Sequence, residues 1–380
     1  MRGHITKRSK NSYSIKVSLG KDAMGNYKYQ WITVKGNKTT AQKRLSEILN
    51  QLDNGTFMKP SKTTLREYFE KWLADYATPK LSPRSLERYS GIVRNSIIPE
   101  LGHIILTQLK PEHIQSHYSA MLESGLSART VHYHHAVIHK ALQTAVKWGL
   151  ASRNVADAVD PPRIKRPEMQ YWNEDETASF LKTAENSPYY ELFYMALFTG
   201  MRRGELLALR WQDVDLILSQ VYVNRSLHQL KNGSYVFTEP KSERSRRTIA
   251  LPLSAKLELI ELYEKSKSNG EKLGTHLQDS DLVFSHIDGR PLRPNTITNA
   301  WRFLCKKANV KPIRLHDARH THASLMLKQG IHPKVVQERL GHSSISITLD
   351  TYSHVSPGIQ EAAAESFDKL LFPKREKEAV

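Results

Sequence analysis

The sequence predicts a multidomain α+β protein: a small N-terminal three-stranded sheet with one helix, an all-α region of four helices, and a mixed, mainly α region with a small antiparallel sheet. Three observations support this prediction. The chain has 380 residues, too many for one ordinary hydrophobic core. Apolar side chains alternate near the N-terminus, as in strands, and recur at helical spacing after residue 64. Proline-containing segments at 55–62 and 161–167 separate these patterns.

The N-terminal region is expected to form a sheet because polar and apolar residues alternate over 12–17 and again over 27–34. A helix is expected at about 40–52, where apolar residues fall on one stripe. A small sheet of this kind can lie in the major groove of DNA. The basic side chains expected to contact DNA include Arg8, Lys10, Lys16 and Lys28.

The net charge of +18 indicates a polyanionic partner, most often a nucleic acid. The charge is uneven along the chain. Residues 1–60 hold 12 basic and 3 acidic residues, residues 61–167 hold 15 and 9, and residues 168–380 hold 29 and 26. The N-terminal region is therefore expected to bind through a general positive field, and the C-terminal region through individually placed cations.

Residues 63–160 are predicted to be all-helical. Thr64 and Glu67 are spaced as the capping-box pair that begins a helix, and apolar residues follow at helical spacing. Further helices are expected to begin near Ser82, Pro111 and Ser127.

The segment 161–167 combines three prolines with three basic residues, Arg163, Lys165 and Arg166. Proline restricts the backbone, so the segment is expected to be stiff. A stiff basic connection between two domains could cross a phosphate backbone, and DNA contacts are predicted for all three side chains.

The region from 168 to 380 is expected to mix helices with a small antiparallel sheet. Asn232-Gly233 is a strong hairpin signal and predicts a strand pair at 218–228 and 234–238. A third strand is expected at 246–251.

Several functions lack support in the sequence. No run of about 18 apolar residues predicts a membrane span, and the polar start predicts no secretory signal. A cytoplasmic protein without membrane association is therefore expected. The single cysteine, Cys305, excludes an internal disulfide and is expected to be a buried helical residue. The chain lacks GxxxxGKS/T, GxGxxG and HExxH patterns, so nucleotide hydrolysis and zinc peptidase chemistry have no basis.

A metal site is not predicted. His320 and His322 lie near Asp317, but residues two apart on a helix diverge by about 200° and do not easily share a ligand sphere. No cofactor is expected.

Polar turns of the last region contain the candidates for chemistry, which are Arg202, Lys241, His316, Arg319, His342 and Tyr352. Arg202 follows Gly200, where a helix is expected to break. His316 and Arg319 are three apart and are expected on one helix face. His342 follows a leucine and a glycine at a helix end, and Tyr352 lies 10 residues beyond it.

Each candidate also has a structural alternative. Taken alone, Arg202 would more often be a helix-end arginine bonded to carbonyl groups. Lys241 could belong to a solvated charge run with Arg244, Arg246 and Arg247, whose arginines would touch DNA backbone or water. His342 could simply cap a helix.

Taken together, these residues resemble the catalytic domain of tyrosine recombinases, the phage and mobile-element integrases. The chain has a TGxRxxE segment with Arg202 and Glu205, a lysine in a hairpin turn, an HxxR box, an LGH box and a following tyrosine, in the family's order. One such motif would be weak evidence, but the set is specific. The resemblance implies an arm-type DNA-binding domain at 1–55, a core-binding (SAM-like, four-helix) domain at 63–160 and a catalytic domain at 168–380.

The resemblance also implies how the site would work, without metal or ATP. Arg202 and Arg319 would hold phosphate oxygens, and Tyr352 would attack phosphorus to form a 3′-phosphotyrosine link. The other implied roles are a base (His316), an acid for the 5′ oxygen (Lys241), a phosphate hydrogen-bond donor (His342) and an orienting carboxylate (Glu205).

The implied function is integration and excision of a mobile element through a Holliday junction. The implied partners are core and arm attachment sites in double-stranded DNA, three further copies in a homo-tetramer, and an accessory bending or directionality protein. An amphipathic segment at 359–372 is expected to dock on the neighbouring protomer, and the alternative is packing onto its own domain. The alternatives are a chromosome or plasmid dimer-resolving recombinase, whose family members usually lack the extra β domain, and a non-catalytic DNA-binding regulator.

Overall fold

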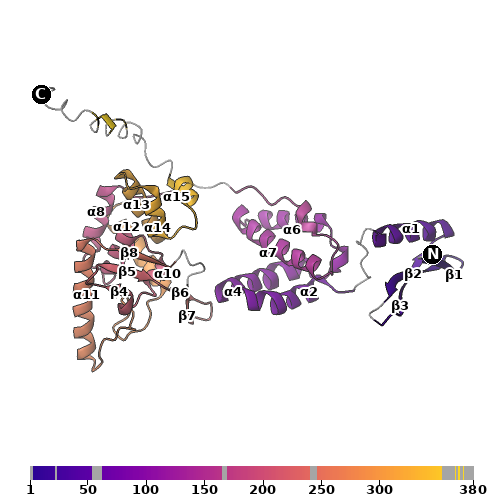
Figure 1. Ribbon diagram of the computed structural model, residues 1–380, viewed down its shortest axis with the longest axis horizontal. Helices are drawn as coiled ribbons and strands as arrows, with labels where there is room; N and C mark the ends of the chain where they lie inside the picture. The colour runs from indigo at the N-terminus through magenta and orange to yellow at the C-terminus, as the bar shows by residue number, and fades with distance from the viewer. Residues whose placement is uncertain are drawn as a thin grey trace. The chain divides into compact units, whose positions relative to one another are not determined.

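The computed structural model describes residues 3–21, 24–53, 62–164, 169–239 and 246–352, together with positions 364, 367, 368 and 371 (Figure 1). The chain divides into two compact units, Met1–Arg166 and Pro167–Val380. None of the described helices is both long and apolar enough to cross a membrane.

The first unit begins with an antiparallel sheet in the order β1-β2-β3, and one helix covers one of its faces. The elements are β1 (Gly3–Ser9), β2 (Ser12–Lys21), β3 (Tyr27–Lys35) and α1 (Lys38–Asp53). Ile15, Val17 and Ile48 form the buried apolar contact between sheet and helix. The predicted three-stranded sheet with one helix is confirmed.

The opposite face of this sheet is cationic and aromatic. Lys16 pairs in register with Trp31, and its ammonium lies 3.9 Å from the ring centroid of Tyr29 and 5.2 Å from that of Trp31. Both rings are about half exposed, because side chains alternate between the two faces and α1 covers the other one.

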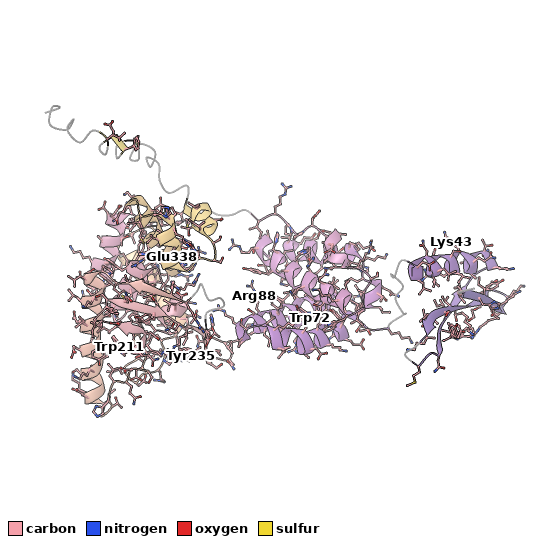
Figure 2. All side chains as sticks on the ribbon, viewed as in Figure 1. Lys43, Trp72, Arg88, Trp211, Tyr235 and Glu338 are labelled. Carbon is pink, nitrogen blue, oxygen red and sulfur yellow. The ribbon has the colours of Figure 1, made fainter. Side chains whose placement is uncertain are left out.

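The rest of the first unit is helical. Its elements are α2 (Leu65–Trp72), the π-helical turn η1 (Leu73–Ala77), α3 (Thr78–Lys80), α4 (Pro83–Ile92), the π-helical turn η2 (Val93–Ile97), α5 (Ile98–Leu101), η3 (Leu106–Gln108), α6 (Pro111–Glu123), α7 (Ala128–Lys147) and η4 (Val155–Ala158). The predicted capping box of Thr64 and Glu67 is present. Trp72, fully buried, stacks on Tyr76 and Tyr89 in the core of these helices (Figure 2).

The second unit surrounds small sheets with helices. Its elements are α8 (Glu174–Ala184), α9 (Tyr190–Thr199), α10 (Arg203–Leu206), η5 (Trp211–Asp213), β4 (Val214–Asp215), β5 (Gln220–Val223), β6 (Ser226–Gln229), β7 (Tyr235–Thr238), β8 (Arg247–Ala250), α11 (Leu253–Lys272), α12 (Pro294–Lys307), η7 (Leu315–Asp317), α13 (Ala318–Lys328), α14 (Pro333–Leu340) and α15 (Ile345–Tyr352). Trp172, Phe180 and Trp301 pack together at its centre, with ring centroids 4.4 to 5.1 Å apart. Cys305 is buried on α12, as predicted.

The prediction of a single strand at 218–228 is wrong, because this segment forms two strands that belong to two different sheets. β5 lies between β4 and β8, whereas β6 pairs with β7 across the predicted Asn232-Gly233 turn. Two side chains hold the chain where it passes from one sheet to the other. Asn224 Nδ2 donates to Asp213 Oδ1 at 3.1 Å, and Arg225 Nε donates to the Ala208 carbonyl at 2.8 Å. The third predicted strand, β8, therefore joins β5 instead of the hairpin.

The predicted amphipathic helix at 359–372 lies largely outside the described residues. Of the residues in it that the structure describes, Phe367 and Leu371 are exposed.

Candidate active site

The site is built where the end of α9 meets α13 and α14. Gly200 ends α9 in the left-handed conformation, with φ of 64°. An added Cβ there would lie 2.7 Å from Leu340 Cδ2 and 2.9 Å from His322 Cδ2, so glycine is required by both backbone and packing. Arg319 Nη1 donates to the Gly200 carbonyl at 2.9 Å, and its Nη2 donates to the Leu340 carbonyl. The three elements are thus joined through Arg319.

Arg202 stands at the N-terminus of the short helix α10. Its Nη1 donates to Glu205 Oε1 at 2.8 Å, and its backbone N–H donates to Glu205 Oε2 at 2.9 Å. The side chain of Arg202 is 39% exposed, whereas that of Glu205 is 7% exposed. The guanidinium is therefore held from behind by a buried carboxylate and presents a face to solvent.

Glu205 is ionised in this structure. Burial alone would raise its pKa, but the charges of Arg247 and Arg202 and the hydrogen bonds they donate lower the pKa to about 2. A carboxylate that is always charged at neutral pH keeps both guanidiniums in place.

Arg247 is a site residue that the sequence analysis assigned wrongly to a solvated or DNA-contacting charge run. Its side chain is 5% exposed and makes two bonds to Glu205, the shorter at 2.8 Å, while Nε donates to the Arg339 carbonyl at 2.7 Å. The alternation of side chains along the strand could have predicted that Arg247 is buried, because it shares a face of β8 with the buried Ile249.

The expectation that His316 and Arg319 share one helix face is also corrected. His316 is exposed and lies in the 3₁₀ turn η7, whereas Arg319 is 3% exposed and lies in the first turn of α13. The turn forms because the buried Asp317 carboxylate accepts hydrogen bonds from both the backbone and the guanidinium of Arg314. Desolvation by the surrounding protein, and then the charge of Arg319, lower the pKa of His316.

His342 follows Gly341, which ends α14 with φ of 66°. The main chain of His342 caps the helix, as the structural alternative predicts, since its N–H donates to the Gln337 carbonyl at 3.1 Å. The imidazole makes a separate contact, with Nδ1 2.9 Å from Thr348 Oγ1 in α15. Burial, followed by the charges of Arg319 and Arg202, lowers the pKa of His342 to about 3. His342 is thus neutral and lies within the field of both arginines.

Two further residues, Arg339 and His322, hold the elements of the site together. The sequence did not predict that they bond to each other. Arg339 Nε donates to His322 Nε2 at 3.0 Å, so the proton of His322 is on Nδ1, which donates to the Leu197 carbonyl at 2.9 Å. Arg339 also donates to the carbonyls of Phe198 and Ala250. These bonds tie α14 to α9, α13 and the end of β8. Within the part of the chain that the structure describes, no group of three or more His, Cys, Asp or Glu side chains is placed to hold a metal ion.

Some predicted residues lie outside the description. Lys241 and Arg244 are in the segment 240–245, and Lys165 and Arg166 are in 165–168. Position 352 ends α15, but the Tyr352 side chain is not among those described. Of the other predicted DNA contacts, Lys16 is partly buried beneath aromatic rings, and the exposed side chains are Arg8, Lys10, Lys28 and Arg163.

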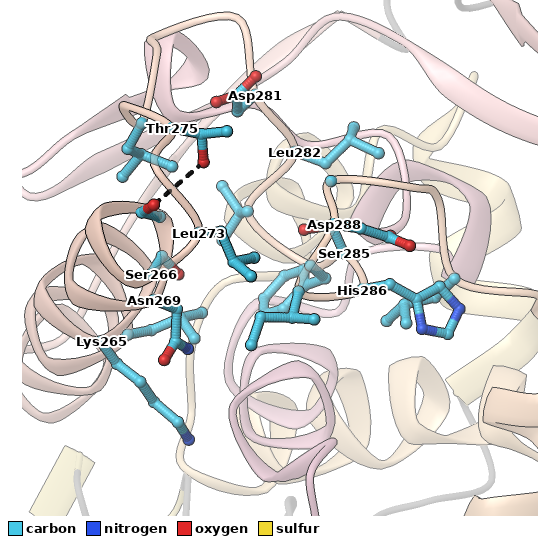
Figure 3. A pocket seen from close by; sticks show the side chains of 18 of the residues that line it. Lys265, Ser266, Asn269, Leu273, Thr275, Asp281, Leu282, Ser285, His286 and Asp288 are labelled. Carbon is cyan, nitrogen blue, oxygen red and sulfur yellow. Dashed lines mark hydrogen bonds between the residues drawn. The ribbon is translucent and has the colours of Figure 1, made fainter.

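A pocket of about 630 Å³ lies elsewhere, between α9, the end of α11 and the loop that precedes α12 (Figure 3). Lys265 at its rim pairs with Glu191 at 3.5 Å, and Thr275 Oγ1 donates to the Gly270 carbonyl. None of the candidate catalytic residues lines this pocket. This pocket is therefore separate from the candidate site.

Comparison with known proteins identifies the class of this molecule. Residues 170–358 match the phage integrase family, and residues 64–122 match the N-terminal SAM-like domain of phage integrases. The two matches together span about two thirds of the chain. The chain therefore belongs to the phage integrase family, whose members are tyrosine recombinases that cut and rejoin DNA.

Individual relatives align with almost the entire chain. The ICEBs1 integrase of Bacillus subtilis (strain 168) is 27% identical over 373 residues, covering 97% of this chain and all of that protein. A protein of Caldanaerobacter subterraneus named tyrosine recombinase XerC-like is also 27% identical, covering 97% of this chain and 98% of its own.

Solved structures of low sequence identity share the fold. The Tn1549 transposon integrase, in complex with transposon right end DNA, has a TM-score of 0.66 at 21% identity, covering 81% of this chain and 99% of its own. The lambda integrase tetramer bound to a Holliday junction has a TM-score of 0.58 at 18% identity, covering 94% and 96%.

Proposed function

We propose that this chain integrates and excises a mobile DNA element by site-specific recombination, with Tyr352 as nucleophile. The observation that carries the proposal is the grouping of Arg202, Arg319 and His342 in a member of the phage integrase family. Arg319 bonds to the carbonyl of Leu340, two residues before His342, and the charges of both arginines lower the pKa of the histidine. A relative named integrase covers 97% of the chain.

The chemistry follows from the charges. Attack of the Tyr352 phenolic oxygen on phosphorus forms a 3′-phosphotyrosine bond and breaks the bond to the 5′ oxygen. A second negative charge builds on the phosphate in the transition state, and the fixed guanidiniums of Arg202 and Arg319 stabilise it. His316 accepts the phenolic proton, and Lys241 returns a proton to the 5′ oxygen. The link preserves the bond energy, so the reverse attack rejoins the strand.

The lowered pKa of His316 supports its role as a base. A histidine with a pKa below its usual range is neutral at pH 7 and has a lone pair to accept the phenolic proton. A neutral His342 has one N–H to donate to a phosphate oxygen.

The remaining chain would bind DNA in three parts: an arm-type domain at 1–55, a four-helix core-binding domain at 63–160, and the catalytic domain at 168–380. The cationic, aromatic face of the N-terminal sheet supports the first assignment. For the second, the Arg88 guanidinium on α4 stacks 3.4 Å above the exposed ring of Tyr133 on α7, a surface suited to a phosphate backbone (Figure 2). Four copies would act together on paired sites, and the lambda structure on a Holliday junction is a tetramer.

A dimer-resolving recombinase would use the same site chemistry, and one full-length relative bears a XerC-like name. The N-terminal sheet, with its excess positive charge, favours integration over dimer resolution, because an integrase binds a second DNA site to which this surface could attach. A non-catalytic regulator would have no need for a buried Glu205 that holds two arginines.

A nicked core-site substrate that traps the covalent intermediate tests the site. The wild-type protein should form a protein–DNA adduct in EDTA, and Arg202→Gln should form it about 100-fold more slowly while still binding DNA. Cleavage that requires a divalent metal, or an unchanged rate in the variant, would contradict the proposal.

The arm-site assignment has its own test. Lys16→Gln should weaken arm-site binding and reduce the salt slope by about 1. Lys43→Gln is the matched control, because Lys43 lies on α1, which covers the other face of the sheet (Figure 2). Equal effects of the two changes would refute the face assignment.

A further inference from the structure

Thr348 is a buried hydroxyl residue next to the candidate site. It is fully buried in α15, and its Oγ1 lies 2.9 Å from His342 Nδ1. His342 is itself held on its main chain, where N–H donates to the Gln337 carbonyl and the carbonyl accepts from Gln337 Nε2 at 2.8 Å. The main-chain bonds fix the position of His342. The contact with Thr348 can therefore determine only the orientation of the ring and which ring nitrogen carries the proton.

We infer that Thr348 is a positioning residue that donates its hydroxyl proton to His342 Nδ1, so that the imidazole carries its proton on Nε2 and directs it at the DNA phosphate. This inference rests on the proposed function and extends it to a residue outside the motif set.

The direction of the hydrogen bond follows from burial and protonation. A fully buried hydroxyl must use its hydrogen, and Nδ1 is an acceptor at hydrogen-bond distance. The positive field of Arg319 and Arg202 keeps the pKa of His342 far below neutrality, so the ring has a single proton. If Thr348 occupies the Nδ1 lone pair, the proton must be on Nε2. The opposite tautomer would present a lone pair to an anionic phosphate and would repel it.

The same bond connects two elements that the reaction must align. His342 is fixed to the end of α14, and Thr348 lies one helical turn before position 352 in α15. Only residues 341–344 separate the two helices. The Thr348 hydroxyl therefore couples the orientation of the phosphate donor to the helix that carries the proposed nucleophile.

The test compares two variants of the full-length protein on a nicked core-site substrate. Thr348→Val keeps the shape of the side chain and removes the hydroxyl, and it should slow adduct formation about 10- to 100-fold without changing DNA affinity. Thr348→Ser retains the hydroxyl and should restore the rate to within about threefold of wild type. Thr144→Val is the control: Thr144 is also buried, its hydroxyl bonds to the Lys140 carbonyl, and it belongs to the other compact unit.

A second readout does not depend on cleavage. In ¹⁵N-histidine-labelled protein without DNA, the His342 signal, assigned with His342→Gln, should report the Nε2–H tautomer in wild type and in Thr348→Ser, and a mixture in Thr348→Val. An Nδ1–H tautomer in wild type, or a serine variant as slow as the valine variant, would overturn the inference. Absence of any adduct in wild type would refute the proposed function, while the tautomer measurement would still decide the role of Thr348.

Discussion

At the residue scale, Glu205 pairs with two arginines that differ in exposure. We expect the buried arginine to stabilise the fold and the exposed one to contact the phosphate. Arg202 is 39% exposed and faces solvent, whereas Arg247 is 5% exposed. Removing a buried partner leaves a charge without compensation, which is a large effect in proteins. Removing the exposed partner should mainly affect phosphate binding.

Arg247→Met should therefore lower the free energy of unfolding by about 3 to 5 kcal/mol, because Glu205 remains buried with a single guanidinium. The adjacent Arg246→Met is the control. Arg246 is 55% exposed and pairs with the exposed Glu239, so its loss should change stability by less than about 1 kcal/mol. Urea denaturation measures both, and equal losses would show that burial of the Arg247–Glu205 pair does not matter.

The short motifs of the sequence predict the site residues themselves but not the residues that hold them in place. Arg202, Glu205, Arg319 and His342 were predicted from short patterns, and the structure brings them together. Arg247 and Arg339 were not identified as site residues, because they bond to main-chain carbonyls distant in sequence. Thr348 was not identified because it belongs to none of the short patterns, although it contacts His342 only six residues away. Motif spacing holds no information about such contacts.

At the scale of elements, the turn after α9 is a tightly packed junction of the site. Gly200 combines a left-handed backbone with an added Cβ that would lie 2.7 Å from Leu340 Cδ2. Gly330, just beyond the end of α13, has φ of 76° and nothing within 4 Å of the same position. A substitution at Gly330 therefore reports the cost of the left-handed backbone alone, whereas one at Gly200 reports that cost together with the packing clash.

Gly330→Ala should cost only the left-handed backbone penalty, about 1 to 2 kcal/mol. Gly200→Ala should cost clearly more and should also slow strand cleavage, since the Arg319 guanidinium bonds to the Gly200 carbonyl. Thermal denaturation and the adduct assay measure the two effects. Equal destabilisation by the two variants would contradict the packing argument.

The elements themselves were predicted unevenly. The capping box at Thr64 and the turn at Asn232-Gly233 have local causes and were predicted correctly. The split between β5 and β6 was missed, because Leu227 resumes the period of Val221 and Val223 beyond it, while the bonds of Asn224 and Arg225 to residues 213 and 208 divide the strand. Local pattern cannot reveal which sheet a strand joins.

At the scale of the whole molecule, buried neutral histidines predict how stability depends on pH. The pKa is lowered to about 3 for His322 and to about 4 for His134, chiefly by burial, so each compact unit contains one. The unfolded chain binds protons at its usual pKa near 6.5 and the folded chain does not, so stability must rise with pH through this window.

Acidification from pH 7 to pH 5 should therefore destabilise both units before most carboxylates titrate. For His322 alone the expected loss is about 2 kcal/mol. Urea denaturation at the two pH values should show every transition move to lower urea at pH 5. Transitions that stay fixed or move to higher urea would contradict the neutral, buried state of these rings.

The net charge of +18 is divided unequally along the chain, and the division matches a proposed division of roles. The excess of 9 positive charges in residues 1–60 suits salt-dependent binding of a DNA arm. Residues 168–380 have nearly balanced charge, and their cations are placed individually around the candidate site. Under the proposed function, the N-terminal charge would bind DNA broadly, and the cations placed around the candidate site would act on one phosphate.

Mapping the covalent bond to DNA tests the central claim most directly. Trypsin cuts after Arg339 and Lys369, and Tyr352 is the single tyrosine in residues 340–369. Mass spectrometry of the trapped adduct should find the nucleotide mass on this peptide, bonded to Tyr352, and Tyr352→Phe should yield no adduct. A nucleotide bonded to any other residue, or an adduct that survives in Tyr352→Phe, would contradict the account.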